Sequence, residues 1–215
     1  MLILSLIQNP IYLIFFVLAL LLAITVHEFA HAWMAYKSGD STAMLEGRLT
    51  LNPLAHLDPL GTIFLFLVGF GWGKPVPTNP NNYNKRSDEI KIALAGIVAN
   101  IILALVLAIP IRIAILTGHT IDSSNLLLIL NIFVDINIVL AAFNILPIFP
   151  LDGSHIVGYF LSDDAKISYE QYGPFILLAV LIFDRLSNFS ILTTIMEPII
   201  RFLSFLIKGT FSFFM

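Results

Sequence analysis

Cysteine is absent from this chain of 215 residues. Without thiols the protein can form no disulfide bond, no thiolate metal site and no cysteine nucleophile. Any metal site must therefore use nitrogen and oxygen ligands. The redox compartment stays undetermined, because cysteine usage is the feature that would indicate it.

Charged residues are also scarce, at 12% of the chain, whereas 58% of the residues are hydrophobic. A water-soluble fold of this length would lack the polar side chains needed to cover its surface, so we predict an integral membrane protein in contact with the lipid bilayer. The basic residues are scattered and the net charge is -3, which gives no electrostatic footprint for nucleic acid. The amino terminus lacks the basic flank and cleavage site of a signal peptide, so its apolar run is expected to be a mature helix.

Several apolar segments are long enough to cross a hydrocarbon core about 30 Å thick, which requires roughly 20 helical residues. The sequence predicts an all-α polytopic membrane protein with about five transmembrane helices. The segments are Pro10 to Tyr36, Ile90 to Leu116, Leu126 to Pro147, Gly173 to Phe183 and Phe189 to Ile207, with a polar loop from Ser162 to Gln171. The glycine-rich stretch Gly61 to Gly73 favours a re-entrant or hairpin segment near residues 60–83. Residues 1–215 are expected to form a single domain.

Two histidines and a glutamate end the first apolar segment, in the stretch HEFAH. The pattern H-E-x-x-H on a helix places His27 and His31 one turn apart on one face, where both imidazoles can bind one zinc ion. Glu28 is offset from this face and can reach a water molecule rather than the metal, which suits a general base. A merely structural polar patch is a poor alternative, because ionisable side chains inside a span are costly.

A catalytic zinc needs a third protein ligand and an open fourth position. Asp152 is the preferred candidate: two prolines break the preceding helix in NILPIFPLDGSH, and an irregular backbone there presents a carboxylate at membrane depth. An ordinary Asp-Gly turn is the alternative interpretation. His155 is a second choice. His56 is also a candidate but could equally be a loop histidine, and His119 is expected to lie in a loop as a structural or solvated residue.

The stretches HEFAH, NILPIFPLDG and GIVAN together resemble the site-2 protease family of intramembrane zinc metalloproteases. The resemblance extends from about Ile24 to His155 and is greatest to the minimal bacterial or archaeal branch, which has no PDZ or CBS domain. A short chain of this kind would lack the regulation that such domains provide.

The resemblance implies a role for five residues. Zn2+ would be held by His27, His31 and Asp152, Glu28 would activate water, and Asn144 would lie at the active site. Asn144 would donate an amide hydrogen bond to the oxyanion or hold the substrate strand. Asn100 is a second candidate donor, with interhelical hydrogen bonding as an equal alternative. Packing between helices is the expected role of Gly96.

The expected activity is hydrolysis of peptide bonds within or near transmembrane segments of membrane proteins, that is, regulated intramembrane proteolysis. The expected partner is thus a transmembrane protein substrate, and the oligomeric state is not fixed by the sequence. A membrane zinc protease of soluble or misfolded proteins is one alternative, although it would more naturally have a larger aqueous domain. A zinc-binding or transport protein is another, although it would not require Glu28.

The distribution of positive charge predicts an orientation. One side of the membrane would hold Lys37, Arg48, Lys74, Lys85, Arg86 and Lys91, whereas the next loop offers only Arg112. By the positive-inside rule the rich side is cytoplasmic. We therefore expect a protein of the cell (plasma) membrane with its active site towards the cytoplasm.

Overall fold

The computed structural model describes residues 10–68, 71–187 and 189–211. Over these residues the protein is helical and β pairing is limited to one isolated bridge between Leu57 and Gly73, which confirms the all-α class. The longer helices are α2 (Pro10–Lys37), α4 (Pro59–Val68), α5 (Asp88–Leu107), α6 (Ile109–Leu116), α7 (Asn125–Asn144), α8 (Gly153–Phe160), α9 (Asp163–Leu186) and α10 (Ile191–Lys208). Short helical turns lie between them: α3 (Thr42–Leu45), η1 (Pro53–Ala55), η2 (Pro80–Asn82) and η3 (Ile121–Ser123).

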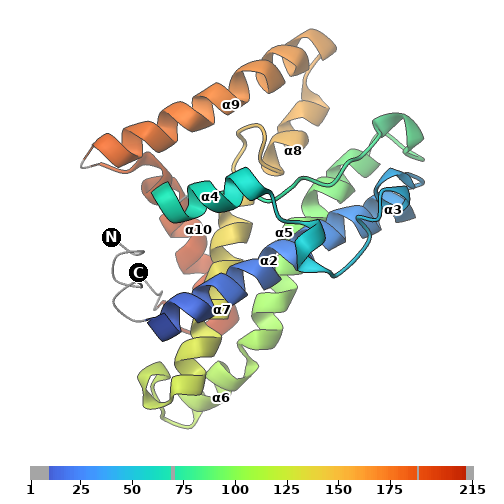
Figure 1. Ribbon diagram of the computed structural model, residues 1–215. Coiled ribbons are helices and arrows are strands. Elements are labelled where there is room, and N and C mark those ends of the chain that lie inside the picture. The colour runs from blue at the N-terminus through green and yellow to red at the C-terminus, as the bar shows by residue number, and fades with distance from the viewer. Residues whose placement is uncertain (1–9, 69–70, 188, 212–215) are drawn as a thin grey trace.

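Helices α2, α5 and α7 pack against one another and form the centre of the molecule (Figure 1). These three are long and apolar enough to cross a membrane, and the bent pair α9 and α10, whose axes meet at 96°, would raise the number to four. The predicted count of about five is therefore not confirmed. Only 22% of the apolar window of α2 is buried, as expected for a helix whose outer side faces lipid.

Two predicted boundaries are wrong. The expected span Ile90 to Leu116 is interrupted at Ala108 and continues as the separate helix α6, because Pro110 lacks the N–H that would continue the hydrogen-bond ladder. The expected polar loop Ser162 to Gln171 is instead the first part of α9. Acidic residues in the first turn of α9 complement the positive end of the helix dipole, which allows this polar segment to be helical.

The segment after α2 folds back on itself, in agreement with the predicted hairpin near residues 60–83. The chain leaves through α4 and returns so that the N–H of Lys74 donates to the carbonyl of His56 at 2.9 Å. This returning segment reaches the side of α2, where it becomes part of the candidate site.

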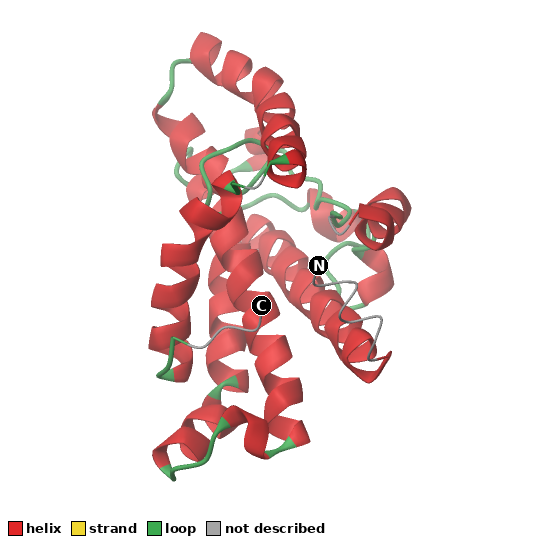
Figure 2. Ribbon diagram, turned by 90° about the vertical axis from the view of Figure 1, so that its left-hand side faces the viewer, coloured by secondary structure: helices red, strands yellow, loops and turns green. Residues whose placement is uncertain are grey.

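An apolar core between α5, α7 and α10 holds the rest of the bundle together. Figure 2 shows that the described residues form helices joined by loops and turns. The most buried members of this core include Ala104, Val134, Ile138, Ala142 and Ile207. Small buried residues on α2 and α5, among them Ala23 and Ala93, favour a close approach of these two helices, and Asn100 of α5 donates to the carbonyl of Ala23 at 3.0 Å.

Candidate metal centre

The two histidines of HEFAH lie one helical turn apart on α2 and face the bundle interior. Their Nε2 atoms are 3.0 Å apart, and the side chains of His27 and His31 are almost fully buried. His31 lies six residues before the end of α2 at Lys37, about 9 Å along the helix axis. The pair is therefore inside the spanning segment but near one of its ends.

Helix α5 fixes both imidazole rings through their Nδ1 atoms. Nδ1 of His31 is 2.7 Å from the carbonyl oxygen of Ile92, and Nδ1 of His27 is 2.7 Å from Oδ1 of Asn100. A carbonyl oxygen can only accept a hydrogen bond, so each Nδ1 carries a proton and donates. The lone pair of each neutral ring is then on Nε2, which faces the centre of the cluster.

The orientation of Asn100 follows from its other partners. Its Nδ2 donates to the carbonyl of Ala23 at 3.0 Å and to Oδ1 of Asn137 at 2.8 Å. Asn137 in turn donates from Nδ2 to the carbonyl of Phe133 at 2.8 Å. With its Nδ2 already engaged, Asn100 is a holder of His27 rather than an oxyanion donor, so of its two predicted roles the interhelical one agrees with the geometry.

Gly96 has a more specific role than the general packing expected from the sequence. A Cβ atom at this position would lie 2.4 Å from Nε2 of His31 and 2.6 Å from Cε1 of His27. Only glycine therefore allows α5 to approach the two imidazoles closely enough for Ile92 and Asn100 to accept their hydrogen bonds.

Asp152 reaches the same point from the irregular segment between α7 and α8. Its Oδ2 lies 3.1 Å from Nε2 of His27 and 3.3 Å from Nε2 of His31. The next residue, Gly153, lets the turn close on itself, because a Cβ there would be 2.2 Å from the carbonyl oxygen of Ile145. The Asp-Gly pair thus forms a tight turn that places the carboxylate of Asp152 beside the two histidines.

The donor set fits a divalent cation. Three electron-pair donors, the two Nε2 atoms and Oδ2 of Asp152, converge, and Oδ2 is buried without a hydrogen-bond donor among the described residues. Such atoms repel one another unless a cation lies between them. Ligands bound at 2.0–2.2 Å to a tetrahedral ion are about 3.3–3.6 Å apart, close to the separations of 3.0, 3.1 and 3.3 Å observed here.

Glu28 points to a different neighbour, the returning segment after α4. Its Oε2 accepts a hydrogen bond from the N–H of Val76 at 3.1 Å. Val76 stands between Pro75 and Pro77, which have no N–H, so it is the single backbone donor of this tripeptide. The contact fixes one carboxylate oxygen and leaves the other, Oε1, available for proton transfer.

Arg48 holds this segment in place. Its guanidinium donates to the carbonyls of Lys74 at 2.7 Å and Pro75 at 3.0 Å, and the side chain is only 4% exposed. Neither Arg48 nor Val76 was predicted to take part in the site. The sequence offers one signal for Val76, because it is the single residue of PVP that has a backbone N–H.

The other candidates lie elsewhere. His56 is fully buried and bonds through Nε2 to the carbonyl of Thr50 at 2.8 Å, and His155 lies 3.3 Å from Oε1 of Glu89. Neither belongs to the three-residue cluster. Asn144 is the last residue of α7, and its Nδ2 donates to the carbonyl of Leu140 at 3.0 Å, so its role at the active site stays a prediction.

The comparisons with known proteins agree with this geometry. The model of peptidase family M50 matches residues 15–111 and 107–183, which include both histidines, the glutamate and the aspartate. The chain belongs to peptidase family M50. This confirms the resemblance to the site-2 protease family that was inferred from the motifs.

Two curated proteins are similar to this M50 chain. It is 39% identical over 185 residues to "Putative zinc metalloprotease YwhC" of Bacillus subtilis (strain 168), covering 81% of this chain and 83% of that protein. It is 28% identical over 177 residues to "Putative zinc metalloprotease Rip2" of Mycolicibacterium smegmatis (strain ATCC 700084 / mc(2)155), covering 78% of this chain and 66% of that protein. No solved structure matches the chain. Family membership and the apolar helices together identify a membrane metalloprotease.

Proposed function

We propose that this M50 protein is an intramembrane zinc protease that cleaves peptide bonds within or near transmembrane segments of membrane proteins. One observation carries the proposal: a cluster of two imidazoles and a carboxylate lies inside the bundle of α2, α5 and α7, close to one end of a spanning helix. A site at this depth is suited to a substrate that lies in the membrane.

In this proposal His27, His31 and Asp152 hold the zinc ion, and the Nδ1–H donors to Ile92 and Asn100 keep both rings in the binding tautomer. When bound, zinc supplies Lewis-acid polarisation of the scissile carbonyl and of a water molecule. The protein's own groups then have to move one proton and bind the substrate.

Glu28 is the proposed proton carrier. Its Oε2 is held by Val76, so Oε1 accepts a proton from the attacking water and delivers it to the nitrogen of the leaving peptide. Asn144 is proposed to donate to the substrate or to the oxyanion, since an amide nitrogen carries a second hydrogen beyond the one given to Leu140.

Proteolysis by the purified protein tests the proposal. The full chain, reconstituted in lipid vesicles with zinc, should cleave a single-span substrate, whereas Glu28→Gln should be inactive and retain roughly stoichiometric zinc. Glu46→Gln is the matched control, because it removes an exposed carboxylate from the same part of the chain and should leave activity unchanged. Cleavage of soluble proteins but of no single-span substrate would favour the alternative membrane protease of soluble or misfolded substrates. Zinc binding without any cleavage would favour a binding or transport role.

The proposed location is the cell membrane, with the active site towards the cytoplasm. The end of α2, the start of α5 and helix α8 gather at one end of the bundle, while α6 lies at the other (Figure 1). Single cysteines introduced at Asn82 and Ser123 should therefore react with a membrane-impermeant thiol reagent from the cytoplasm and from outside, respectively. Labelling of Asn82 from outside would refute this orientation.

A further inference from the structure

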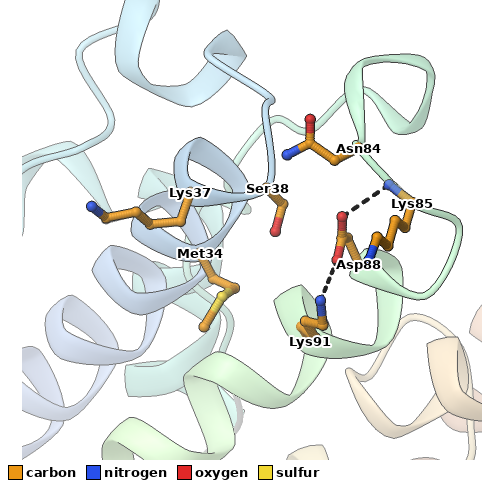
Figure 3. A pocket seen from close by; sticks show the side chains of 7 residues that line it. All are labelled: Met34, Lys37, Ser38, Asn84, Lys85, Asp88 and Lys91. Atoms are coloured by element: carbon orange, nitrogen blue, oxygen red, sulfur yellow. Dashed lines mark hydrogen bonds and ion pairs between the residues drawn. The ribbon is translucent and has the colours of Figure 1, made fainter.

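A cavity of about 240 Å³ lies where the end of α2 meets the start of α5, separate from the metal centre (Figure 3). It is lined by Met34, Lys37, Ser38, Asn84, Lys85, Asp88 and Lys91. None of these residues binds metal or acts on the substrate in the proposed reaction. The cavity thus needs an explanation of its own.

The walls of this cavity carry more positive than negative charge. Three lysines and a single carboxylate line it, which leaves two positive charges in excess. The ammonium group of Lys37 is turned towards the ring of Trp33, 5.8 Å from its centroid, so Lys85 and Lys91 are the lysines beside the carboxylate. That carboxylate, Asp88, is already satisfied: Oδ1 lies 2.6 Å from Nζ of Lys91, and Oδ2 accepts from the backbone N–H of Lys85 at 3.0 Å. Among the described residues, the ammonium groups of Lys37 and Lys85 have no carboxylate within ion-pair distance. An anion is therefore the favoured occupant.

A buried hydroxyl group is directed into the same space. Ser38 is only 5% exposed, and its Oγ makes no hydrogen bond to any residue that the structure describes. Figure 3 shows this oxygen pointing into the gap between the walls formed by α2 and α5. Since no described residue engages this hydroxyl, it is free to donate a hydrogen bond to an acceptor bound in the cavity.

The cavity lies at the level expected for lipid headgroups. Helix α2 is a candidate span and ends at Lys37. Its last turns expose two aromatic side chains, Trp33 at 45% and Tyr36 at 41%, and such residues concentrate where a membrane meets water. Nearer the amino end of α2, Leu18 and Leu22 are also exposed and give the helix an apolar outer side.

We propose that this cavity binds the phosphate headgroup of an anionic phospholipid. Ser38 and Lys85 donate to the phosphate oxygens, and the acyl chains lie along the apolar outer side of α2. The excess of positive charge favours a headgroup with a net negative charge over a zwitterionic one, whose ammonium group would be repelled. Since the bound phosphate bridges α2 and α5, the lipid also stabilises the contact between the histidines and the carbonyl of Ile92.

Lipid retention by the purified full chain in detergent tests this proposal. Native mass spectrometry should show tighter binding of phosphatidylglycerol than of phosphatidylcholine. Lys85→Gln should weaken phosphatidylglycerol binding about fivefold. One lysine near a membrane surface contributes about 1 kcal/mol of binding free energy, which corresponds to this factor. Ser38→Ala should also weaken it, yet leave the unfolding temperature of the lipid-free protein unchanged, because its hydroxyl bonds to none of the residues that the structure describes.

Arg185→Gln is the matched control: it removes one positive charge from α9, away from the cavity, and should retain full lipid binding. Equal binding of the two lipids, or unaltered binding in both cavity variants, would overturn the proposal. Inorganic phosphate should compete only weakly with the lipid. If phosphate alone binds as tightly as phosphatidylglycerol, the site is one for a free anion and the lipid assignment is wrong.

Discussion

Replacing Gly96 by alanine tests the geometry of the metal centre with a single methyl group. The added Cβ would lie 2.4 Å from Nε2 of His31, whereas ordinary contacts of a Cβ begin at 3.4 Å. To restore an ordinary contact, α5 and α2 must separate by about 1 Å. The two hydrogen bonds of 2.7 Å from the imidazoles to Ile92 and Asn100 would then lengthen to about 3.7 Å and be lost.

The expected loss has two parts. Overpacking at a helix contact costs about 1–3 kcal/mol of unfolding free energy. Loss of the groups that orient metal-binding histidines lowers metal affinity about 10–100-fold. Gly96→Ala should therefore show a lower unfolding temperature, weaker zinc binding in a chelator competition, and little or no proteolysis.

Gly158→Ala is the matched control, because it places the same methyl group in helix α8 at 3.5 Å from the flexible Lys166 side chain. It should be neutral or slightly stabilising, as alanine is favoured over glycine inside a helix. Zinc affinity of Gly96→Ala equal to that of the wild type would refute the close approach of α5 to the histidines.

Three further predictions concern residues outside the ligand set. Lys208→Met should lower the unfolding free energy measured by chemical denaturation by about 3–5 kcal/mol. The substitution removes the ammonium group that lies 2.7 Å from Oδ1 of buried Asp135 and leaves this carboxylate without its ion-pair partner. A decrease of less than about 1 kcal/mol would contradict the importance of the pair. Arg48→Lys should lower kcat about tenfold with zinc content unchanged. A lysine can hold only one of the two carbonyls, those of Lys74 and Pro75, in the segment that binds Glu28. Full activity of the variant would show that Arg48 does not position this segment. Burial raises the pKa of Asp40, but hydrogen bonds from Asn82, Thr42 and Asn79 outweigh this and hold the pKa below its ordinary value. The stabilisation by the charged Asp40 is thus complete above about pH 4 and is lost as the pH falls through the lowered pKa. Thermal unfolding should therefore be less acid-sensitive in Asp40→Asn than in the wild type. Identical pH profiles of the two proteins would contradict this role of Asp40.

The sequence allowed prediction of the parts of the site that depend on local spacing. A four-residue interval on a helix brings His27 and His31 to one face whatever the rest of the fold does, and the prolines and glycine around Asp152 indicate an irregular turn. The grouping of these three side chains in the structure is a matter of tertiary packing. Spacing alone left Asp152, His56 and His155 as alternatives for the third position.

The partners of the site could not be predicted, because they depend on which helix faces are in contact. Ile92 accepts through its backbone carbonyl and Val76 donates through its backbone N–H. The identity of a side chain does not reveal either contact. Gly96 appeared to be a general packing residue, since a sequence does not reveal what its missing side chain would meet. The extent of α9 was also mispredicted, because polar residues at the start of a helix are compositionally similar to a loop.

X-ray absorption at the zinc edge of the purified, zinc-loaded protein is the most direct test of the proposed metal centre. We expect one zinc ion per chain, bound by two imidazole ligands, with oxygen as the remaining ligand atoms. In Asp152→Ala, the two imidazoles should persist while zinc affinity falls. A shell with three imidazoles, or with none, would contradict the assignment of His27, His31 and Asp152 as the metal ligands.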